Sequence, residues 1–333
     1  MMHIMYICLL MFNYRLKFGD MTTVTTTSII SNVYHMEIDK SDTDTIILST
    51  SQRLLIFNTR DNTLTSIAGN SSAYGYRDGV GDEVWFNFIS GFTQTNSRTV
   101  VVVDAYNNCL RQIDLSTRRV SHYAGVCTSR GYEDGAADQA KFFYPWSVYV
   151  NKKNDTNIIV SDTGNKALRE VSTITQRVIT LMSVAPYEPL AISWHPHNNS
   201  IIYISCECVV ITVDMTSVSS GYNTLTSYVC TEYRESSWLN DIIFLTDATL
   251  LLADNSYGQL YVYNINTDTS YSICTGERDS VDGDISQCTL FNPLSLLRDN
   301  NHIYVGQNDG NIRKLSGMCV IIILSNKISH DTK

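Results

Sequence analysis

The histidines are the first residues of this chain that could do chemistry. His195 and His197 form the only close histidine pair, in the segment SWHPHNNS at residues 193–200. Two imidazoles can hold a metal if a third ligand joins them from elsewhere in the fold. A His-Pro step followed by two asparagines is also ordinary turn chemistry. We therefore expect a turn here and no metal.

Two groups of acidic residues raise the question of calcium. They are Asp78, Asp82 and Glu83, and Asp279, Asp282 and Asp284. Neither group has the spacing of a helix-flanked calcium loop. Both contain an Asp-Gly step, in which aspartate closes a turn and glycine accepts positive φ. We therefore expect structural loops. Nucleophile-elbow and phosphate-loop motifs are absent from the chain, and we predict no cofactor.

These acidic loops belong to an internal repeat. Residues 75–87 (GYRDGVGDEVWFN) return as residues 131–143 (GYEDGAADQAKFF), and more loosely as residues 280–293 (SVDGDISQCTLFNP). The first two aspartates, Asp78 and Asp134, are 56 residues apart, and Asp282 follows 148 residues later, or three steps of about 49. A period in this range indicates a fold built from equivalent units.

Each unit is predicted to form a small sheet. Residues 101–114, 158–171 and 250–263 share a short apolar run, a turn rich in Asp, Asn or Gly, and an alternating run, which together indicate a hairpin. A third and a fourth apolar run follow in most units. Four short strands per unit are typical of a propeller blade, because neighbouring blades bury what one blade cannot. Inner strands are expected near Val33, Ile89, Trp146, Leu190, Leu239 and Leu294.

The sequence therefore predicts an all-β, six-bladed propeller over residues 28–325, after a leader at 1–27 and before a tail at 326–333. The strand that closes the ring is ambiguous. Residues 318–324 (MCVIIIL) and residues 22–30 (TTVTTTSII) both read as strands. We favour the C-terminal run, because it follows the preceding strand at a suitable distance.

The repeats resemble the NHL-repeat family of six-bladed, TolB-like propellers. The family pattern of strand, turn, Arg-containing strand and Asp-Gly connector is matched in order by Val103-Asp104, Asn107-Asn108, residues 110–113, residues 123–125, Asp134-Gly135, residues 140–142 and Pro145. The tight match covers about 50 residues. It implies a propeller, but this scaffold hosts enzymes and binding modules alike.

The resemblance also defines what an enzyme of this fold would need. Peptide-amidating lyases that share this family's fold use a set of histidine ligands, and no such set is visible on the inner strands. Calcium-dependent lactonases of related folds use Glu, Asn and Asp at the central tunnel, for which Glu37, Asn240 and Asp241 are the candidates. Solvated strand ends explain this triplet better. A metal-dependent lyase or lactonase is kept as the alternative function.

Composition argues against a nucleic-acid partner. The chain has 24 Lys plus Arg against 33 Asp plus Glu, a net charge of -9. Nucleic-acid binding draws most of its affinity from Lys and Arg.

The apolar run at residues 4–12 is too short to span a bilayer, which needs about 20 residues. We therefore expect no membrane span. The run fits a signal peptide, a non-domain leader or a misplaced start.

Nine cysteines bear on the compartment. Cys274 and Cys288 bracket one Asp-Gly loop, and Cys109 and Cys127 lie near the corresponding region of another. We predict these two pairs as disulfides, which favours an extracellular, secreted protein over a cytoplasmic one. The parallel side chains of Cys206 and Cys208 on one strand make a bond between them unfavourable.

The favoured reading is a non-catalytic scaffold that binds a protein or peptide. The connectors at residues 73–88 and 126–144 are the expected contact surfaces, because loops on a rigid framework carry recognition. The residues proposed for contact are Tyr76, Arg77, Asp78, Arg130, Tyr132, Glu133 and Asp134. The oligomeric state is left open.

Overall fold

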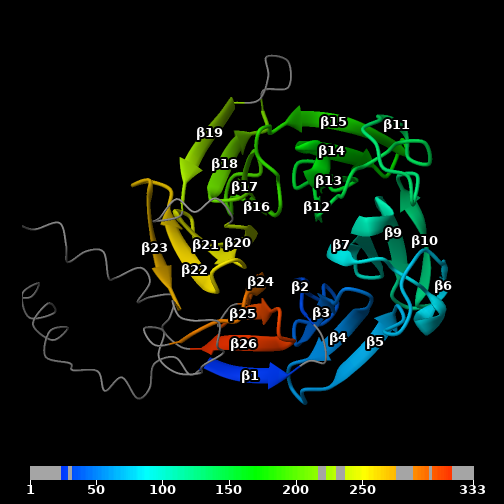
Figure 1. Cartoon of the computed structure of the whole chain (residues 1–333), viewed down its shortest axis with the longest axis horizontal. Helices are drawn as coiled ribbons and strands as arrows, with labels where there is room; N and C mark the ends of the chain where they lie inside the picture. Colours follow the sequence, from blue (N-terminus) through cyan, green and yellow to red (C-terminus); the bar gives the residue numbers. More distant parts are fainter. Residues whose placement is uncertain are drawn as a thin grey trace, which may run out of the picture.

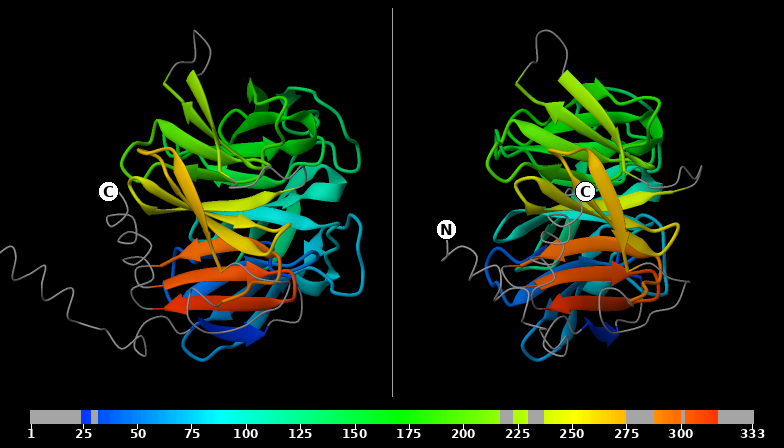
Figure 2. Two further views of the ribbon diagram at one scale, coloured as in Figure 1. Left: turned by 60° about the vertical axis from the view of Figure 1, so that its left-hand side comes forward. Right: turned by 90° about the vertical axis from the view of Figure 1, so that its left-hand side faces the viewer.

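Six small antiparallel sheets surround one axis, so the predicted six-bladed propeller is confirmed (Figure 1). The computed structural model describes residues 24–28, 32–216, 223–229, 237–274, 288–299 and 302–316. Every regular element in these residues is a strand or a short 3-10 turn. Side views show the blades forming a disc (Figure 2).

The blades are numbered from the N-terminal side of the chain, and each is given from its inner strand outward. Blade 1 is β2 (His35–Ile38), β3 (Thr45–Ser49), β4 (Leu54–Asn58) and β5 (Leu64–Ala68). Blade 2 is β7 (Ile89–Asn96), β8 (Thr99–Asp104), β9 (Cys109–Asp114), β10 (Arg119–Ala124) and β6 (Gly79–Val80). Blade 3 is β12 (Ser147–Val150), β13 (Asn157–Asp162), β14 (Ala167–Ser172), β15 (Arg177–Ser183) and β11 (Gly135–Ala136).

The remaining blades follow the same order. Blade 4 is β16 (Ile192–Trp194), β17 (Ile201–Ser205), β18 (Val209–Asp214) and β19 (Asn223–Tyr228). Blade 5 is β20 (Leu239–Thr246), β21 (Thr249–Asp254), β22 (Gln259–Asn264) and β23 (Thr269–Ile273). Blade 6 is β24 (Pro293–Arg298), β25 (His302–Gln307), β26 (Asn311–Ser316) and β1 (Val24–Ser28). All six inner strands begin at or within two residues of their predicted starts.

The ring is closed by the N-terminal strand. β1 pairs antiparallel with β26, from Val24 opposite Leu315 to Ser28 opposite Asn311. The prediction that residues 318–324 fill this position is wrong, because β1 already occupies the outer edge of blade 6. Both runs are rich in residues that favour strands, so local sequence could not choose between them. Residues 318–324, the residues before β1 that were assigned to a leader, and the tail lie outside the described residues.

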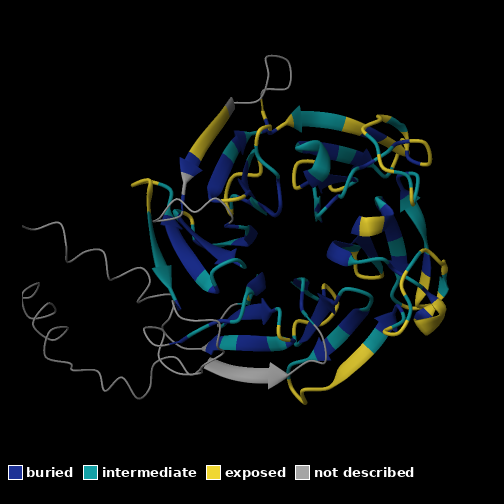
Figure 3. Ribbon diagram, viewed as in Figure 1, coloured by how far each residue is buried: buried dark blue, intermediate teal, exposed yellow. Residues whose placement is uncertain are grey.

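The apolar core lies between the blades, and each of the six blade interfaces has its own cluster of buried side chains (Figure 3). Every residue of β13 (NIIVSD) is buried, as expected for a strand covered on both faces. The interface between blades 6 and 1 joins Met36 and Leu48 to Tyr304 and Ile312. Closure therefore buries apolar surface as well as pairing an edge.

Chain direction gives the disc two distinct faces. At one face of the disc, each inner strand begins where the connector from the previous blade arrives. The turns between the second and third strands lie at the same face, which we call the connector face. The opposite end carries the hairpins between inner and second strands, such as residues 246–249; we call it the hairpin face. Both predicted contact loops, at residues 73–88 and 126–144, run to the connector face.

Candidate binding face and its buried anchors

A fully buried arginine fixes the first predicted contact loop to blade 2. Arg111 on β9 lies beneath residues 75–87. Its Nη1 donates to the Trp85 carbonyl (2.7 Å) and to Oδ2 of Asp104 (3.1 Å). Its Nη2 donates to the Arg77 carbonyl (2.8 Å) and to Oδ1 of Asp78 (2.6 Å). The guanidinium therefore joins both sides of the loop to the end of β8.

The same anchor is built again in blade 3. Arg169 on β14 is also fully buried. Its Nη1 donates to Oδ2 of Asp162 (2.7 Å) and to the Lys141 carbonyl (3.1 Å). Its Nη2 donates to the Glu133 carbonyl (2.8 Å) and to Oδ1 of Asp134 (2.7 Å). In blades 2 and 3 the aspartate of the repeated Asp-Gly motif is thus explained by a structural ion pair. The third copy of the motif, with Asp279, Asp282 and Asp284, lies outside the described residues.

Aromatic rings cover both guanidinium groups. Tyr76 lies with its ring centroid 4.9 Å from the Arg111 Cζ atom, and Phe86 lies at 4.6 Å. Tyr132 and Phe142 take the equivalent places at Arg169, at 5.1 and 5.2 Å. Desolvated cation–π contacts of this kind stabilise a buried cation. Each connector is consequently held by charge, hydrogen bonds and ring packing together.

Two asparagines complete the anchors. The side-chain amide of Asn107 donates to the Gly75 carbonyl (2.8 Å) and to Asp104 (2.9 Å). Asn165 donates in the same way to Gly131 (2.8 Å) and to Asp162 (2.8 Å). Because Asp104 and Asp162 are completely buried, these bonds help compensate their desolvation.

Burial controls the acid–base properties of these carboxylates. Desolvation raises the pKa of Asp104 to about 6, against the opposing effect of Arg111. Burial also raises the pKa of Asp162. For Asp134, burial acts in the raising direction, but hydrogen bonds from Thr180 and Arg169 lower its pKa below the ordinary value. Asp134 is therefore ionised at neutral pH.

The predicted contact residues separate into anchored and exposed groups. Asp78 and Asp134 direct their carboxylates to the buried arginines. Tyr76 and Tyr132 cover the guanidiniums while remaining 40% and 51% exposed. The remaining members are exposed: Arg77 lies over Trp85 (5.6 Å), Arg130 lies over Phe143 (5.3 Å), and Glu133 pairs with Lys141 (2.8 Å). Their role in binding stays a prediction.

Polar side chains near the hub connect neighbouring inner strands. Asp241 on β20 accepts the Leu296 N–H of blade 6 (2.8 Å), and Glu37 on β2 accepts the Gln94 N–H of blade 2 (2.8 Å). Both carboxylates of the lactonase-like triplet thus bond backbone groups of the adjacent blade. Its third member, Asn240, is buried, and its Oδ1 has no hydrogen-bond partner within the described residues. The expectation of solvated strand ends is therefore wrong for Asn240 and Asp241, which are both buried.

His35, the first residue of β2, lies beside these carboxylates. Its Nε2 is 3.8 Å from Glu37 Oε1, and its ring contacts Phe92 edge to face at 4.9 Å. Burial acts to lower the pKa of His35, but Glu37 and Asp241 outweigh it and raise the pKa above its ordinary value. Burial raises the pKa of Asp241.

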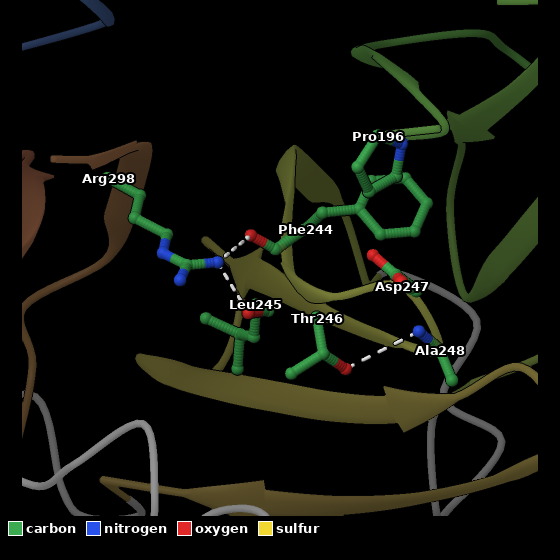
Figure 4. Close-up of a pocket in the computed structure, with 7 residues that line it drawn as sticks. All are labelled: Pro196, Phe244, Leu245, Thr246, Asp247, Ala248 and Arg298. Atoms are coloured by element: carbon green, nitrogen blue, oxygen red, sulfur yellow. Dashed lines mark hydrogen bonds between the residues drawn. The ribbon is translucent and has the colours of Figure 1, made fainter. Parts of the chain in front are cut away.

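The hairpin face contains a hollow of about 510 Å³ between blades 4, 5 and 6 (Figure 4). It is lined by Pro196, Phe244, Leu245, Thr246, Asp247, Ala248 and Arg298. Arg298 Nη1 donates to the Phe244 carbonyl (3.0 Å) and the Leu245 carbonyl, so its guanidinium is engaged by the wall. Thr246 and Asp247 add a hydroxyl and a carboxylate to this lining.

His195 and His197 border this hollow as a turn. His195 Nδ1 accepts the His197 N–H (3.2 Å), and the His197 ring pairs with Asp247 (3.0 Å) where both are exposed. Across the described parts of the chain, no three His, Cys, Asp or Glu residues are close enough to hold a metal. The alternative function, a metal-dependent enzyme, therefore remains a prediction, and the described residues do not supply a set of metal ligands for it.

Both predicted disulfides are present, joining Cys109 to Cys127 and Cys274 to Cys288. Cys208 is also disulfide-bonded, and not to Cys206, whose thiol is free and buried. Disulfides persist in oxidising compartments and are rare in the cytosol. They indicate a non-cytosolic location. In the described segments, no helix is long and apolar enough to cross a bilayer.

The fold and anchors define the chain as a disulfide-bonded six-bladed propeller, and its solved neighbours share that fold. Auxiliary nutrient binding proteins from Bacteroides thetaiotaomicron and Bacteroides ovatus match 86% and 89% of this chain, both with a TM-score of 0.65. The matches cover 69% and 76% of those chains, at 10% and 13% identity. Virginiamycin B lyase from Staphylococcus aureus matches 89% of this chain and 99% of its own, at 10% identity and a TM-score of 0.58.

At the level of sequence, a 102-residue stretch is 28% identical to the Arabidopsis thaliana protein SUPPRESSOR OF QUENCHING 1, chloroplastic. The match covers 31% of this chain and only 9% of that protein's length. No protein-family profile matches the chain. The sequence identities to the solved structures are so low that these matches show a shared fold alone.

Proposed function

We propose that this chain is an NHL-type, TolB-like propeller module that acts outside the cytosol and binds a protein or peptide partner on its connector face. The observation that carries the proposal is the pair of matching loops on blades 2 and 3. Each is held from beneath by a buried arginine, and each presents a half-exposed tyrosine beside an exposed arginine (Tyr76 with Arg77, Tyr132 with Arg130).

This arrangement suits recognition on physical grounds. Tyrosine and arginine carry a large share of interface energy, and a preformed loop loses less entropy on binding than a flexible one. The net charge of -9 disfavours a nucleic acid in this role. The binding function of the two Bacteroides neighbours supports a binding role for such a scaffold, without indicating the ligand.

A displayed random-peptide library tests the proposal. The library would be panned against the wild-type protein and against an Arg77→Ala/Arg130→Ala variant. Both arginines are exposed, so we expect an unchanged melting temperature and at least tenfold weaker binding of the selected peptides to the variant.

The matched control is Arg60→Ala/Arg98→Ala, which removes the same charge from exposed turns on the hairpin face. It should bind the selected peptides as the wild type does. The proposal fails if no peptide is enriched on the wild-type protein, or if the selected peptides bind the Arg77/Arg130 variant equally well.

A further inference from the structure

Five aromatic side chains from three blades meet at the hub end of the connector face. Tyr34 precedes β2, Phe88 precedes β7, Trp146 precedes β12, Tyr106 lies in η3 (Ala105–Asn107), and Tyr144 lies in the second connector. We call this group the aromatic platform. Tyr106 is 49% exposed and the other four are partly exposed, so the cluster faces solvent.

The rings touch one another in a continuous surface. Centroids are 5.0 Å apart for Phe88 and Tyr106, 5.2 Å for Tyr106 and Tyr144, 6.1 Å for Tyr144 and Trp146, and 5.7 Å for Trp146 and Phe88. Tyr34 adds an edge contact to Phe88 at 4.6 Å. Rings this close leave no gap among them for an ammonium group, as an aromatic cage would need. The platform instead offers ring faces and edges for stacking.

Two of the platform residues have a strained backbone. Phe88 has φ of 78° and Tyr144 has φ of 53°, in the left-handed region that bulky residues rarely adopt. Local bonds hold them there: the Phe88 carbonyl accepts the Ala105 N–H (2.9 Å), and the Tyr144 N–H donates to Asn108 Oδ1 (2.8 Å). This strain occurs at equivalent positions of blades 2 and 3. Backbone strain persists only where the surrounding structure holds it, and it is common at functional sites, so the placement of these two side chains is a feature to explain.

Hydrogen bonding decides what the platform can recognise. The neighbouring amide acceptors are already engaged, since Asn108 Oδ1 accepts from Tyr144 and Asn308 Oδ1 accepts from Asn32 (2.5 Å). Within the described residues, the indole N–H of Trp146 makes no hydrogen bond. Burial raises the pKa of Tyr144, and its interaction with the Tyr106 side chain raises it further, so the Tyr144 hydroxyl is protonated at neutral pH.

The platform therefore combines aromatic faces with donors. A sugar requires several acceptors for its own hydroxyl protons, and the two amide oxygens described above already accept one hydrogen bond each. A polyproline II segment has the matching chemistry: its carbonyls are free of internal hydrogen bonds, and proline has no N–H to satisfy. Its ring faces pack against aromatic side chains in known recognition grooves.

We infer that the aromatic platform binds a proline-rich peptide segment in the polyproline II conformation. The inference rests on the proposed function, because it names the class of peptide that the connector face would take. The exposed loops of blades 2 and 3 would then contact residues flanking the proline-rich segment.

Fluorescence anisotropy with a labelled decaproline peptide tests the inference, with a Gly-Ser peptide of equal length for comparison. We expect saturable decaproline binding that is at least tenfold tighter than Gly-Ser binding. Tyr106→Ala should weaken it at least tenfold, because it removes the most exposed ring. Tyr144→Phe, which removes only a hydroxyl, should weaken it severalfold.

The matched control is Tyr74→Ala, which removes a tyrosine that is 73% exposed and lies outside the platform; it should bind decaproline as the wild type does. Equal affinity for the two peptides, unchanged binding by Tyr106→Ala, or binding of a neutral oligosaccharide in place of decaproline would each overturn the inference. If panned peptides without proline depend on Arg77 and Arg130 while decaproline fails, the proposed function stands and this inference falls.

Discussion

Replacing Arg111 by methionine is the sharpest test of the anchor. The change keeps most of the side-chain length but removes the guanidinium that bonds Asp104, Asp78 and two carbonyls. Asp104 is completely buried, so its charge would lose its partner. Breaking a buried ion pair from one side costs about 3–5 kcal/mol. We expect a loss of unfolding free energy in this range, measured by urea denaturation.

A double-mutant cycle separates the ion pair from simple packing. Asp104→Asn removes the charge that Arg111→Met leaves behind, so the double variant should cost less than the sum of the two single changes by at least about 1.5 kcal/mol. Arg118→Met serves as the matched control, because Arg118 and its partner Asp82 are 45% and 72% exposed. An exposed pair is worth only about 0–1 kcal/mol.

Two results would refute the reasoning. If Arg111→Met costs no more than Arg118→Met, the buried arginine is not an anchor. If the single changes add without coupling, the cost comes from lost packing and not from an uncompensated charge.

Three further predictions concern the ring. Changing Cys109 and Cys127 together to serine should cost about 3 kcal/mol of unfolding free energy by calorimetry, because the bond closes a loop over a separation of 18 residues; an unchanged melting temperature would contradict this. Removing residues 1–28 should cause association in size-exclusion chromatography, because β26 would become an open edge; a monomer would contradict it. His35 has a raised pKa in the folded state, so its stabilising contribution is complete below about pH 6.5 and is lost as pH rises through the folded pKa. His35→Gln should flatten that decline in urea titrations at pH 6 and 8, and an unchanged slope would argue against it.

The fold could be predicted because the repeat of about 50 residues is visible in the sequence without any knowledge of long-range contacts. Each blade repeats its own strand and turn pattern, so the inner strands could be located without knowing how the blades pack. The closing strand could not be chosen, because pairing with β26 depends on which end of the chain returns to the same edge. Two strand-like runs compete for that place with similar propensities.

The candidate site was only partly accessible to the same reasoning. Asp78 and Asp134 were selected as contact residues because they recur, yet their carboxylates meet arginines more than 30 positions later in the chain. A signal existed: Arg111 and Arg169 recur with Asp104 and Asp162 at matching offsets. The aromatic platform draws single residues from three blades, and no local pattern brings Tyr34 near Phe88 and Trp146.

The pairing of β1 with β26 has a consequence for biosynthesis. Among the described strands, β1 leaves the ribosome first and its partner β26 leaves it last, so β1 must wait before it can pair. Until then, blade 6 is incomplete and the growing chain displays an unsatisfied sheet edge, the kind of surface that chaperones cover. Such a distant contact also slows folding relative to local hairpins. Cells that make this protein must therefore keep incomplete chains apart until β1 of each chain has paired with its own β26.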